Sequence, residues 1–432
     1  MQNVEKIDVI VVGAGPAGVA AAVTVARGGK TVVMIDRADL AGSKNMFGGA
    51  VYLNSIKDLF PLTWEEAPYE SYISQNRYSF LTESSSVEIN HKTLNYPSAA
   101  TVFRPKFDAW LIEQAKKEGV FYAPKTTVRA LLLDDKRVIG VRTDTEELKA
   151  KVVILADGVQ SNLAQTLKLR KPIKPKDLIL SVKETYYLEN SKIKERFNLV
   201  GNQGMLCEYF GGLSDDKTTG YPFAMGFLYT FKNHISLGIG INAEDLIKMK
   251  KTPYELLERL KAHPDIIPYL DDARSIEYSA HTIPEGDFHH LPKLYTNGAM
   301  LVGDAAGLIN NVHFEGTNYA IYSGILAGET ALEAVKSNNA SKKVLSGYEK
   351  RFKKSFMYKD MRSYRNVVPM LRKMSNSIFL KYPKKMDEFF TLFNMVDTIP
   401  RAVKYRDFAF KTAKSVAPDI PKIAKTVLEV LK

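Results

Sequence analysis

Cysteine is almost absent from this chain. Cys207 is the only cysteine among 432 residues. An internal disulfide needs two cysteines and a cysteine-only iron–sulfur site needs four, so the composition excludes both. A single thiol fits a protein of the reducing cytoplasm. We expect the protein to be cytoplasmic, either free or peripheral on the cytoplasmic face of a membrane.

A convincing targeting or membrane-spanning segment is also missing. The run from Val9 to Ala26 carries no charge, but Gly13, Gly15, Pro16 and Gly18 interrupt it. The run also lacks the basic flank of a signal peptide. We therefore expect a buried strand, a turn and the start of a helix at this place.

Excess charge is lacking over most of the chain. Residues 350–432 hold 20 Lys and Arg against 7 Asp and Glu, which leaves 40 against 41 for residues 1–349. The whole net charge of +12 therefore arises in the last fifth of the sequence. Such a local excess indicates an anionic partner, and no nucleic-acid-binding motif accompanies it, so we exclude nucleic acid.

The N-terminal pattern predicts a βαβ unit. Residues 7–12 are apolar and β-branched, which is typical of a parallel strand buried on both faces. A glycine turn and an alanine-rich helix to about Arg27 follow. A second strand at 31–35 then ends at Asp36.

Later segments give a coarser pattern. The sequence predicts a helix at 106–118, a hairpin at 128–133 and 138–143, strands at 152–155 and 299–302, and a long helix at about 317–335. Between them, residues 176–290 are mostly of β type with one helix near 253–261.

The most informative motif is Gly13-Ala14-Gly15-Pro16-Ala17-Gly18. Gly13 permits a tight turn, Gly15 lets backbone approach a pyrophosphate, and Gly18 lets helix and strand pack closely. The helix N-terminus favours a phosphate. Asp36 follows at the end of the next strand, where a carboxylate can accept from ribose hydroxyls, which favours FAD or NAD over NADP.

Two further motifs follow strands. These are Ala156-Asp157-Gly158, with Ser161 nearby, and Gly303-Asp304-Ala305-Ala306-Gly307. Each alone is typical of an ordinary turn at a strand end. Their order resembles the FAD-binding fold of the p-hydroxybenzoate hydroxylase superfamily. That resemblance implies that Asp304 binds the ribityl chain of FAD and that Arg104 lies near the pyrophosphate.

Three segments narrow the resemblance. Residues 42–49, 103–108 and 303–318 are similar to electron-transfer flavoprotein:quinone oxidoreductases, particularly their bacterial FixC branch. The resemblance implies FAD as cofactor and Gly48-Gly49 beside the flavin ring. The residues expected to bind FAD are Gly13, Gly15, Pro16, Ala17, Gly18, Asp36, Arg37, Ser43, Lys44, Gly48, Gly49, Arg104, Val128, Asp157, Gly158, Gly303, Asp304, Gly316, Thr317 and Asn318.

The start of the helix near Thr317 would face the reactive ring. Its positive end would stabilise the negative charge of reduced flavin, and Gly316, Thr317 and Asn318 would allow close approach and hydrogen bonding. An ordinary helix cap is the alternative explanation. We assign no general acid or base, because electron transfer through flavin requires none, although His313, Glu315 and Lys44 could tune its potential.

This chain departs from the family pattern in one respect, and the departure implies that it acts with partner proteins. Fused members end in an iron–sulfur domain with four cysteines, which this chain lacks. In the FixC branch a separate ferredoxin-like protein holds the cluster. The resemblance therefore implies electron flow from electron-transfer flavoprotein, through that partner, to a quinone, with Leu59–Leu62 and Trp64 as an apolar entrance.

The expected fold is of the α/β class. It combines a Rossmann-type FAD-binding domain (1–175 and 291–345), an inserted mostly-β substrate or quinone domain (176–290, with parts of 50–100) and a basic helical C-terminal region (346–432). That last region has three interpretations. Its Lys and Arg dock a protein partner, or they face anionic lipid beside Phe389, Phe390, Leu392, Phe393 and Met395, or they form a solvated helical face.

Other functions remain open at the level of sequence. The scaffold also resembles geranylgeranyl reductases, which reduce isoprenoid double bonds, and aromatic monooxygenases. Some relatives of this fold have lost FAD and bind prenylated partners. The retained Asp36, Asp157 and Asp304 argue against that last function.

Overall fold

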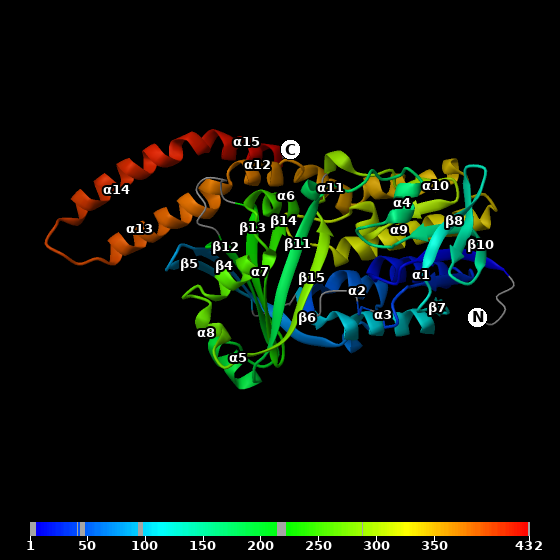
Figure 1. Ribbon diagram of the computed structural model, residues 1–432, viewed down its shortest axis with the longest axis horizontal. Coiled ribbons are helices and arrows are strands. Elements are labelled where there is room, and N and C mark those ends of the chain that lie inside the picture. The colour runs from blue at the N-terminus through cyan, green and yellow to red at the C-terminus, as the bar shows by residue number, and fades with distance from the viewer. Residues whose placement is uncertain are drawn as a thin grey trace. The chain divides into compact units, whose positions relative to one another are not determined.

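The computed structural model describes residues 6–40, 42–43, 48–93, 98–213, 222–286 and 288–430. The chain forms two compact units, each built from separated stretches (Figure 1). Unit 1 comprises Met1–Glu70, Ser98–Leu178 and His281–Arg362, and unit 2 comprises Ser71–Pro97, Ile179–Ala280 and Ser363–Lys432. Residues 346–362 of the expected C-terminal region thus cluster with unit 1, and the rest with unit 2.

Unit 1 contains the predicted parallel sheet. β1 pairs in parallel with β2 and β10, and β10 pairs in parallel with β17. The strands in sheet order are β16 (Tyr295–Thr296), β17 (Ala299–Leu301), β10 (Glu147–Leu155), β1 (Ile7–Val12), β2 (Val32–Ile35) and β7 (Phe121–Ala123). The apolar side chains of residues 9–12, 32–35, 152–155 and 299–301 are buried, as the uninterrupted β-branched runs predict.

Two further strand pairs have their residues in unit 1. The predicted hairpin is present as β8 (Val128–Asp134) and β9 (Arg137–Thr143), and β9 also pairs with the start of β10. β3 (Gly48–Tyr52) pairs in antiparallel fashion with β6 (Ala99–Phe103). The second pair leads directly into the helix that carries Arg104.

Two helices of unit 1 pack unusually closely. These are α1 (Pro16–Arg27) and α9 (Thr317–Lys336). A Cβ on Gly324 would lie 2.2 Å from the Ala17 carbonyl oxygen, and one on Gly328 would lie 2.6 Å from Thr24 Cβ. The two glycines of α9 therefore allow it to lie directly on α1.

The remaining helices of unit 1 cover its core. They are α2 (Leu53–Leu59), α3 (Arg104–Lys117), α4 (Asn162–Thr166), α10 (Lys342–Lys354) and α11 (Phe356–Ser363), with short 3₁₀ turns η1 (Trp64–Glu66), η2 (Pro175–Asp177), η3 (Phe288–His290) and η4 (Gly303–Ala306). In the described part of the chain, no helix combines the length and apolar character that crossing a membrane requires.

Unit 2 is built on a largely antiparallel sheet. Its strands, in sheet order, are β15 (Arg274–Pro284), β11 (Leu178–Tyr187), β14 (His234–Asn242), β13 (Ala224–Thr230), β12 (Gln203–Gly211) and β4 (Tyr69–Leu81), with β5 (Ser86–Lys92) also paired to β4. β12 and β4 pair in parallel, whereas β11 with β14, β14 with β13, β13 with β12, and β4 with β5 pair in antiparallel fashion. The mostly-β character expected for residues 176–290 is confirmed.

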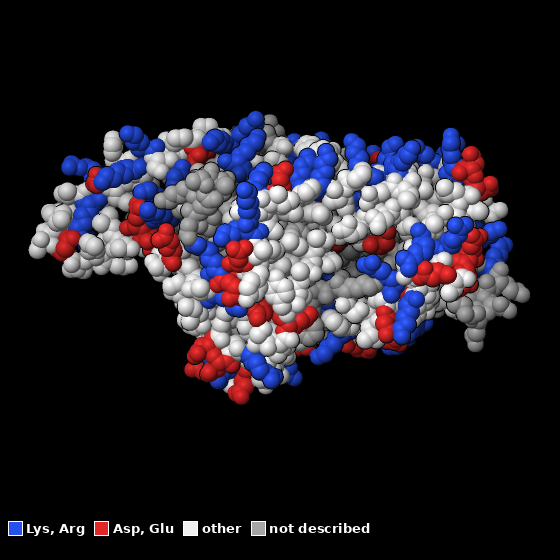
Figure 2. Space-filling view, in the orientation of Figure 1, with Lys and Arg blue, Asp and Glu red and all other residues white. Residues whose placement is uncertain are grey.

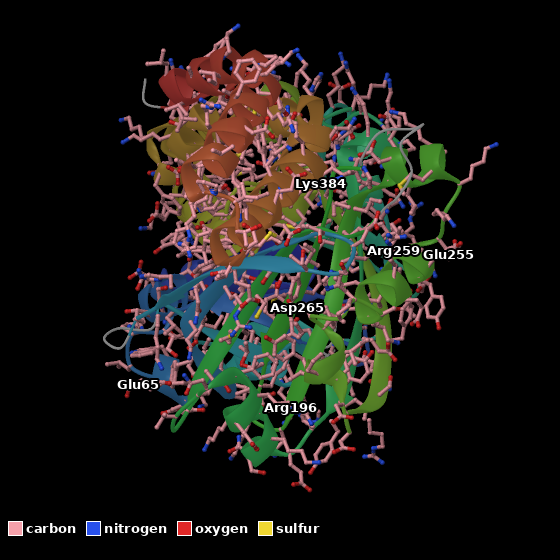
Figure 3. All side chains as sticks on the ribbon, turned by 90° about the vertical axis from the view of Figure 1, so that its left-hand side faces the viewer. Glu65, Arg196, Glu255, Arg259, Asp265 and Lys384 are labelled. Carbon is pink, nitrogen blue, oxygen red and sulfur yellow. The ribbon has the colours of Figure 1, made fainter. Side chains whose placement is uncertain are left out.

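The sequence predicted one helix among residues 176–290, whereas the described residues form four. They are α5 (Asn190–Phe197), α6 (Ala243–Met249), α7 (Pro253–Lys261) and α8 (Ile267–Leu270). Only α7 was predicted. A capping box starts it: Thr252 Oγ1 accepts from the Glu255 N–H, and the Glu255 carboxylate accepts from the Thr252 N–H. Glu255 and Arg259 mark its successive turns in Figure 3.

The chain ends in helices, as expected. They are α12 (Val367–Lys373), the π-helical turn η5 (Ser377–Lys381), α13 (Tyr382–Asn394), α14 (Arg401–Val416), η6 (Ala417–Asp419) and α15 (Ile420–Val430). A buried carboxylate holds them together, because Asp419 accepts from Lys381 Nζ at 2.6 Å and from Tyr382 Oη at 2.9 Å.

Candidate cofactor site

The first glycine motif forms the turn between β1 and α1. Gly13 has φ +104°, and a Cβ there would lie 2.2 Å from the Ala156 carbonyl oxygen. A Cβ on Gly18 would lie 1.9 Å from the Gly13 carbonyl oxygen. Packing alone therefore requires these two glycines. Gly15 differs, since no atom lies within 4 Å of its ideal Cβ position.

The empty space beside Gly15 lies at the N-terminus of α1. Gly15 is the N-cap and Pro16 follows at the first helical position. The first turn of α1 contains no acidic residue, so the positive end of the helix is not neutralised there. The N–H groups of Ala17 and Gly18 belong to the four that an α-helix leaves without intrahelical partners. The turn thus forms a concave anion site.

Asp36 fixes this turn from the end of β2. Its carboxylate accepts from the Ala14 N–H at 2.9 Å and from the Ala38 N–H at 2.7 Å. A carboxylate has about four acceptor positions, so it can also accept from a ribose hydroxyl. Val128 starts β8 two residues after Thr126, whose N–H donates to the Asp36 carbonyl at 2.9 Å.

The second motif lies at the end of β10. Ser161 Oγ donates to Asp157 Oδ1 at 2.7 Å, and Gly158 adopts φ +79°. Burial raises the pKa of Asp157, while Arg170 and the exposed Arg37 act in the opposite direction. The structure therefore brings Arg37 of the first βαβ unit into the electrostatic environment of the second motif.

The third motif lies against the first. Gly303 has φ +57°, and a Cβ there would lie 2.9 Å from Ala17 Cβ. The Gly303 N–H donates to Ser323 Oγ of α9 at 2.9 Å. Burial raises the pKa of the half-buried Asp304, and the positive charges of Arg104 and Arg170 oppose that rise. Motifs almost 300 residues apart in sequence are thus adjacent in space.

Arg170 was not predicted from the sequence, although it joins the second and third motifs. Its Nη1 donates to the carbonyl oxygens of Val159 at 2.7 Å, Ala305 at 3.2 Å and Asp304 at 3.3 Å. Desolvation lowers its pKa. No motif surrounds it, since its neighbours form an ordinary basic stretch, so only the fold identifies this role.

Arg104 begins α3 at the end of β6. Asp108 holds it through two hydrogen bonds, Nε to Oδ1 at 2.8 Å and Nη2 to Oδ2 at 3.0 Å. A Cβ on Gly42 would lie 2.6 Å from the Arg104 carbonyl oxygen, so Gly42 packs on this helix start. Ser43 is exposed, and Lys44 lies outside the described residues.

The glycine pair of β3 lies opposite the strand that leads to Arg104. Gly48 pairs with Phe103 and Gly49 with Val102. No atom lies within 4 Å of an ideal Cβ on Gly49, which leaves space above the strand. This space is compatible with a flat ligand, as the resemblance implied.

The N-terminus of α9 lies in the same unit. Gly316 is the N-cap, and the first turn contains no acidic residue. Asn318 Nδ2 donates to Glu315 Oε2 at 3.4 Å, while Asn318 Oδ1 is buried and has no hydrogen-bond partner. Burial raises the pKa of Glu315. Tyr52 Oη donates to the His313 carbonyl at 3.2 Å, so β3 and this loop are linked.

These features fit FAD. The open backbone at Gly15 and the uncompensated start of α1 match a pyrophosphate, and the unpartnered Asn318 oxygen indicates a missing hydrogen-bond donor. The residues expected to form an apolar entrance, Leu59–Leu62, do not share one exposed surface. Leu59 and Phe60 are buried, whereas Leu62 is 94% exposed.

Comparisons with known proteins agree with FAD as the cofactor. A family model described as FAD dependent oxidoreductase matches residues 8–159. The chain is 39% identical over 409 residues to Protein FixC of Azorhizobium caulinodans, covering 93% of each chain. It is 36% identical over 398 residues to a probable electron transfer flavoprotein-quinone oxidoreductase of Escherichia coli, covering 90% of this chain and 91% of that one.

A solved structure shares the fold. The geranylgeranyl bacteriochlorophyll reductase-like protein of Thermoplasma acidophilum superposes with a TM-score of 0.73 at 21% identity, covering 96% of this chain and 99% of that one. At that identity the likeness concerns the fold alone. The similarity to the two relatives, at 39% and 36% identity, extends over nine-tenths of this chain or more. The chain therefore belongs to the FixC family of FAD-dependent oxidoreductases.

Proposed function

We propose that this protein passes electrons from an electron-transfer flavoprotein to a quinone through its FAD. The observation that carries the proposal is the similarity, over nine-tenths of the chain, to a protein named as a probable electron transfer flavoprotein-quinone oxidoreductase. The cofactor site supports it, because its parts serve binding and charge stabilisation rather than proton transfer.

The cysteine content supports a separate iron–sulfur partner. Cys207 is the only cysteine, and its side chain is buried in unit 2. Burial raises its pKa to about 12, which disfavours the thiolate that a metal needs. We therefore place a cluster on a ferredoxin-like protein that binds to this chain and relays electrons from the flavoprotein.

Each motif has an assigned part in holding FAD. The start of α1, with Gly15, Pro16, Ala17 and Gly18, binds the pyrophosphate. Asp36 accepts from the ribose of the adenosine half, with Arg37, Val128, Asp157 and Gly158 around it. Asp304 binds the ribityl chain and Arg104 faces the pyrophosphate. Bound FAD supplies the ability to accept and release one or two electrons.

The N-terminus of α9 sets the electrostatic environment of the flavin ring. The helix directs its positive N-terminal end, with Gly316, Thr317 and Asn318, at the place assigned to the ring. A positive end favours an added negative charge, typically by about 0.3–1 kcal/mol, and more where water is excluded. No atom lies within 4 Å of an ideal Cβ on Gly49, and we assign Gly48 and Gly49 to the approach of the ring, with Ser43 and Lys44 shortly before them in the sequence.

The proposal predicts a three-component reaction. Purified holoprotein is mixed anaerobically with reduced electron-transfer flavoprotein, a ferredoxin-like protein and a water-soluble quinone, and quinol formation is followed. Rapid quinol formation only when both protein partners are present is the expected result. The Gly15→Val variant, depleted of FAD, serves as the control.

Other outcomes identify the alternatives. A yellow protein that ignores these partners but oxidises NADPH with an isoprenoid substrate is a reductase of the geranylgeranyl type. A folded wild-type protein from which no flavin can be extracted is a binding protein. Either result contradicts the proposed function.

A further inference from the structure

The sheet of unit 2 has one buried and one half-buried face. From Met205 to Gly211 on β12, and along β13, buried and half-buried side chains alternate, as a strand with two different faces requires. The buried face belongs to the same hydrophobic cluster as Leu256, Leu257 and Leu260 of α7. The half-buried face carries Leu206, Glu208, Phe210, Met225, Phe227 and Tyr229.

Glu208 is the acidic residue in the middle of this half-buried face. It lies opposite Phe227 of β13 on one side and opposite Tyr78 of β4 on the other. The Phe227 ring reaches across the next strand, because a Cβ on Gly238 of β14 would lie 2.4 Å from Phe227 Cζ. A carboxyl group therefore stands in a row of aromatic side chains that crosses the sheet.

This carboxyl group has no partner of its own. Among the residues that the structure describes, the Glu208 side chain makes neither a hydrogen bond nor an ion pair. Burial alone therefore acts on it, and burial raises the pKa of Glu208 to about 7. The protonated and the ionised form coexist near neutral pH. A general acid is most effective when its pKa lies near the pH at which it works.

The titratable groups of the neighbouring strands do not neutralise it. On β4, burial and the charge of Glu208 both raise the pKa of Tyr78. On β13, the Tyr229 ring lies 5.1 Å from that of Phe227. At the far end of the row, on β11, Lys183 is buried, and its positive charge opposes the rise in the pKa of Glu277. The cation of this face thus acts on another carboxyl group.

The helical turn η5 covers the same face beside Glu208. Phe379 of this turn stacks on Phe210 of β12, with ring centroids 6.1 Å apart. The cation of the turn, Lys381, is bound to Asp419, because Lys381 Nζ donates to the Asp419 carboxylate at 2.6 Å. The turn therefore adds an aromatic ring to the face and leaves Glu208 without a counter-charge.

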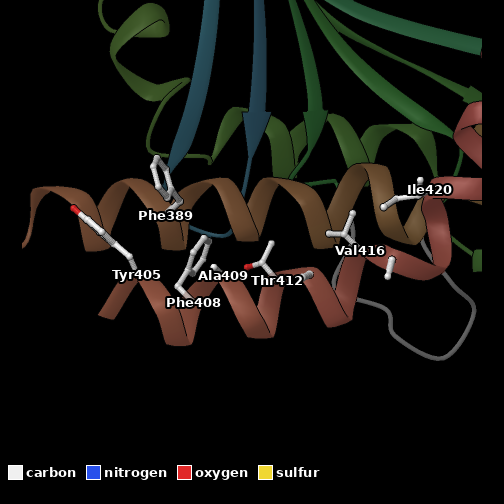
Figure 4. Close-up of a pocket in the computed structure, with 9 residues that line it drawn as sticks. Phe389, Tyr405, Phe408, Ala409, Thr412, Val416 and Ile420 are labelled. Atoms are coloured by element: carbon white, nitrogen blue, oxygen red, sulfur yellow. The ribbon is translucent and has the colours of Figure 1, made fainter. Parts of the chain in front are cut away.

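The other apolar hollow of unit 2 offers no acid. The groove between α13 and α14 has a volume of about 670 Å³, and Phe389 faces Phe408 across it (Figure 4). Tyr405 is the one titratable residue among the lining residues that the structure describes. An apolar ring in that groove would lack a proton donor, whereas the half-buried face combines aromatic side chains with a carboxyl group.

Quinol formation requires such a donor. A quinone takes up two electrons and two protons while both of its C=O groups become O–H groups. We propose that Glu208 donates protons to the quinone oxygens on this face of unit 2. In each transfer the Oε–H bond of Glu208 breaks, an O–H bond forms on the quinone, and the carboxylate regains a proton from water. The electrons are those that the proposed function delivers, so the inference rests on that function.

The row of side chains gives water access to Glu208 from one end. Tyr78 is 37% exposed, and Ile89, which follows it on β5, is 55% exposed. At the other end Lys183 is fully buried. Protons therefore reach the carboxyl group from the β5 edge, and a flat quinone ring stacks on the enclosed side, against Phe227.

Reoxidation of the flavin tests the proposal without any protein partner. Holoprotein reduced with stoichiometric dithionite is mixed anaerobically with a water-soluble quinone, and the returning flavin absorption is followed from about pH 5.5 to 8.5. Glu208→Gln should react about tenfold or more slowly than the wild type at the acid end. The difference should shrink as the pH rises through about 7, because wild-type Glu208 then loses its proton. Glu208→Asp should retain part of the rate and the pH dependence.

Glu195→Gln is the matched control. Glu195 is exposed on α5, at the end of unit 2 where charged side chains gather (Figure 2). This variant should react as the wild type does at every pH. Equal rates for Glu208→Gln and the wild type overturn the proposal, and so does a loss of the same size at every pH, which a structural role would cause. A reduced wild type that the quinone fails to reoxidise overturns the proposed function as well.

Infrared spectroscopy tests the contact without electron transfer. Difference spectra of the oxidised holoprotein are recorded with and without the water-soluble quinone at about pH 6, where the carboxyl group is protonated. The C=O band of a protonated carboxyl group should shift when the quinone binds, and Glu208→Gln should lack this band. In the wild type the band should fade as the pH rises through about 7. A band that the quinone leaves unchanged, or that persists in Glu208→Gln, is incompatible with the proposal.

Discussion

At the scale of single residues, the glycines of the first motif have different functions. Gly13 and Gly18 are required because backbone atoms occupy the space of a side chain, as the 2.2 Å and 1.9 Å approaches show. Gly15 has free space around it and a φ that other residues adopt. Bulk at Gly15 should therefore affect the ligand, whereas bulk at Gly13 should affect the fold.

The first prediction separates these two effects. Gly15→Val should lower bound FAD per chain by roughly tenfold or more, a change of about 1.4 kcal/mol in binding free energy. The apoprotein should lose no more than about 1 kcal/mol of unfolding free energy. Gly13→Ala, the contrasting variant, should lose about 3 kcal/mol or more. Flavin absorbance and urea unfolding measure both, and equal destabilisation by both variants would contradict the assignment.

The second prediction concerns the half-buried carboxylate of Asp304. Burial raises its pKa in the folded protein above the unfolded value of about 3.9. The stability that this group contributes is therefore complete below the unfolded pKa and is lost as the pH rises through the folded pKa. Asp304→Asn should stabilise the apoprotein by about 1 kcal/mol at neutral pH and weaken FAD binding.

Urea unfolding of the apoprotein between neutral pH and about pH 4 tests this sign. The gain should shrink as the pH falls, because the wild-type carboxyl then becomes protonated. Asp134→Asn, at an exposed position in the β8–β9 turn, is the control and should show no such trend. A variant less stable than wild type at neutral pH would contradict the account.

Sequence analysis identified only those site residues that belong to a recognisable motif. Gly13, Asp157 and Asp304 were predicted from the spacing of glycine and aspartate after strands, and they lie together in unit 1. Arg170 and the partner role of Asp108 could not be predicted in this way. Their contacts join segments far apart in the chain or depend on side-chain geometry, and local sequence records neither.

At the scale of elements, the contact between α1 and α9 determines the site. It holds the first motif, at the start of α1, against Gly303, which lies in the segment between β17 and α9. The glycines on α9 make the approach possible. Sequence reasoning predicted both helices but not their contact, because a glycine in a helix has no distinctive pattern of its own.

The third prediction tests this contact. Gly324→Ala should destabilise the protein by about 2 kcal/mol, since its Cβ would meet the rigid Ala17 carbonyl oxygen. It should also weaken FAD binding by displacing the two motifs. Gly347→Ala on α10 is the matched control, because its nearest neighbour is the flexible end of Arg351. That variant should be neutral or stabilised by about 0.5–1 kcal/mol in urea unfolding.

Element length explains which parts were predicted. The strands β1, β2 and β10 and the helix α9 have strong patterns and lie where expected. The helices α5, α6 and α8 contain 4 to 8 residues, too few to display a helical period, and they were missed. α5 and α6 contact β14, and such tertiary contacts support helices that would be too short to form alone.

At the scale of the molecule, each unit combines stretches from three separate parts of the chain. The sequence predicted an interrupted FAD-binding domain, because its motifs stop and resume. The expected central domain included parts of 50–100, and residues 71–97 cluster with it, but the clustering of residues 363–432 with it was not predicted. Such grouping depends on contacts between distant segments, which no periodicity reveals.

Reduction of the flavin by its proposed donor tests the central claim most directly. The holoprotein is mixed anaerobically with reduced electron-transfer flavoprotein and a ferredoxin-like protein, and its visible flavin absorption is recorded. The account predicts one extractable FAD per chain and bleaching that requires both partners. A flavin that these partners leave oxidised, but that NADPH reduces directly, would contradict it.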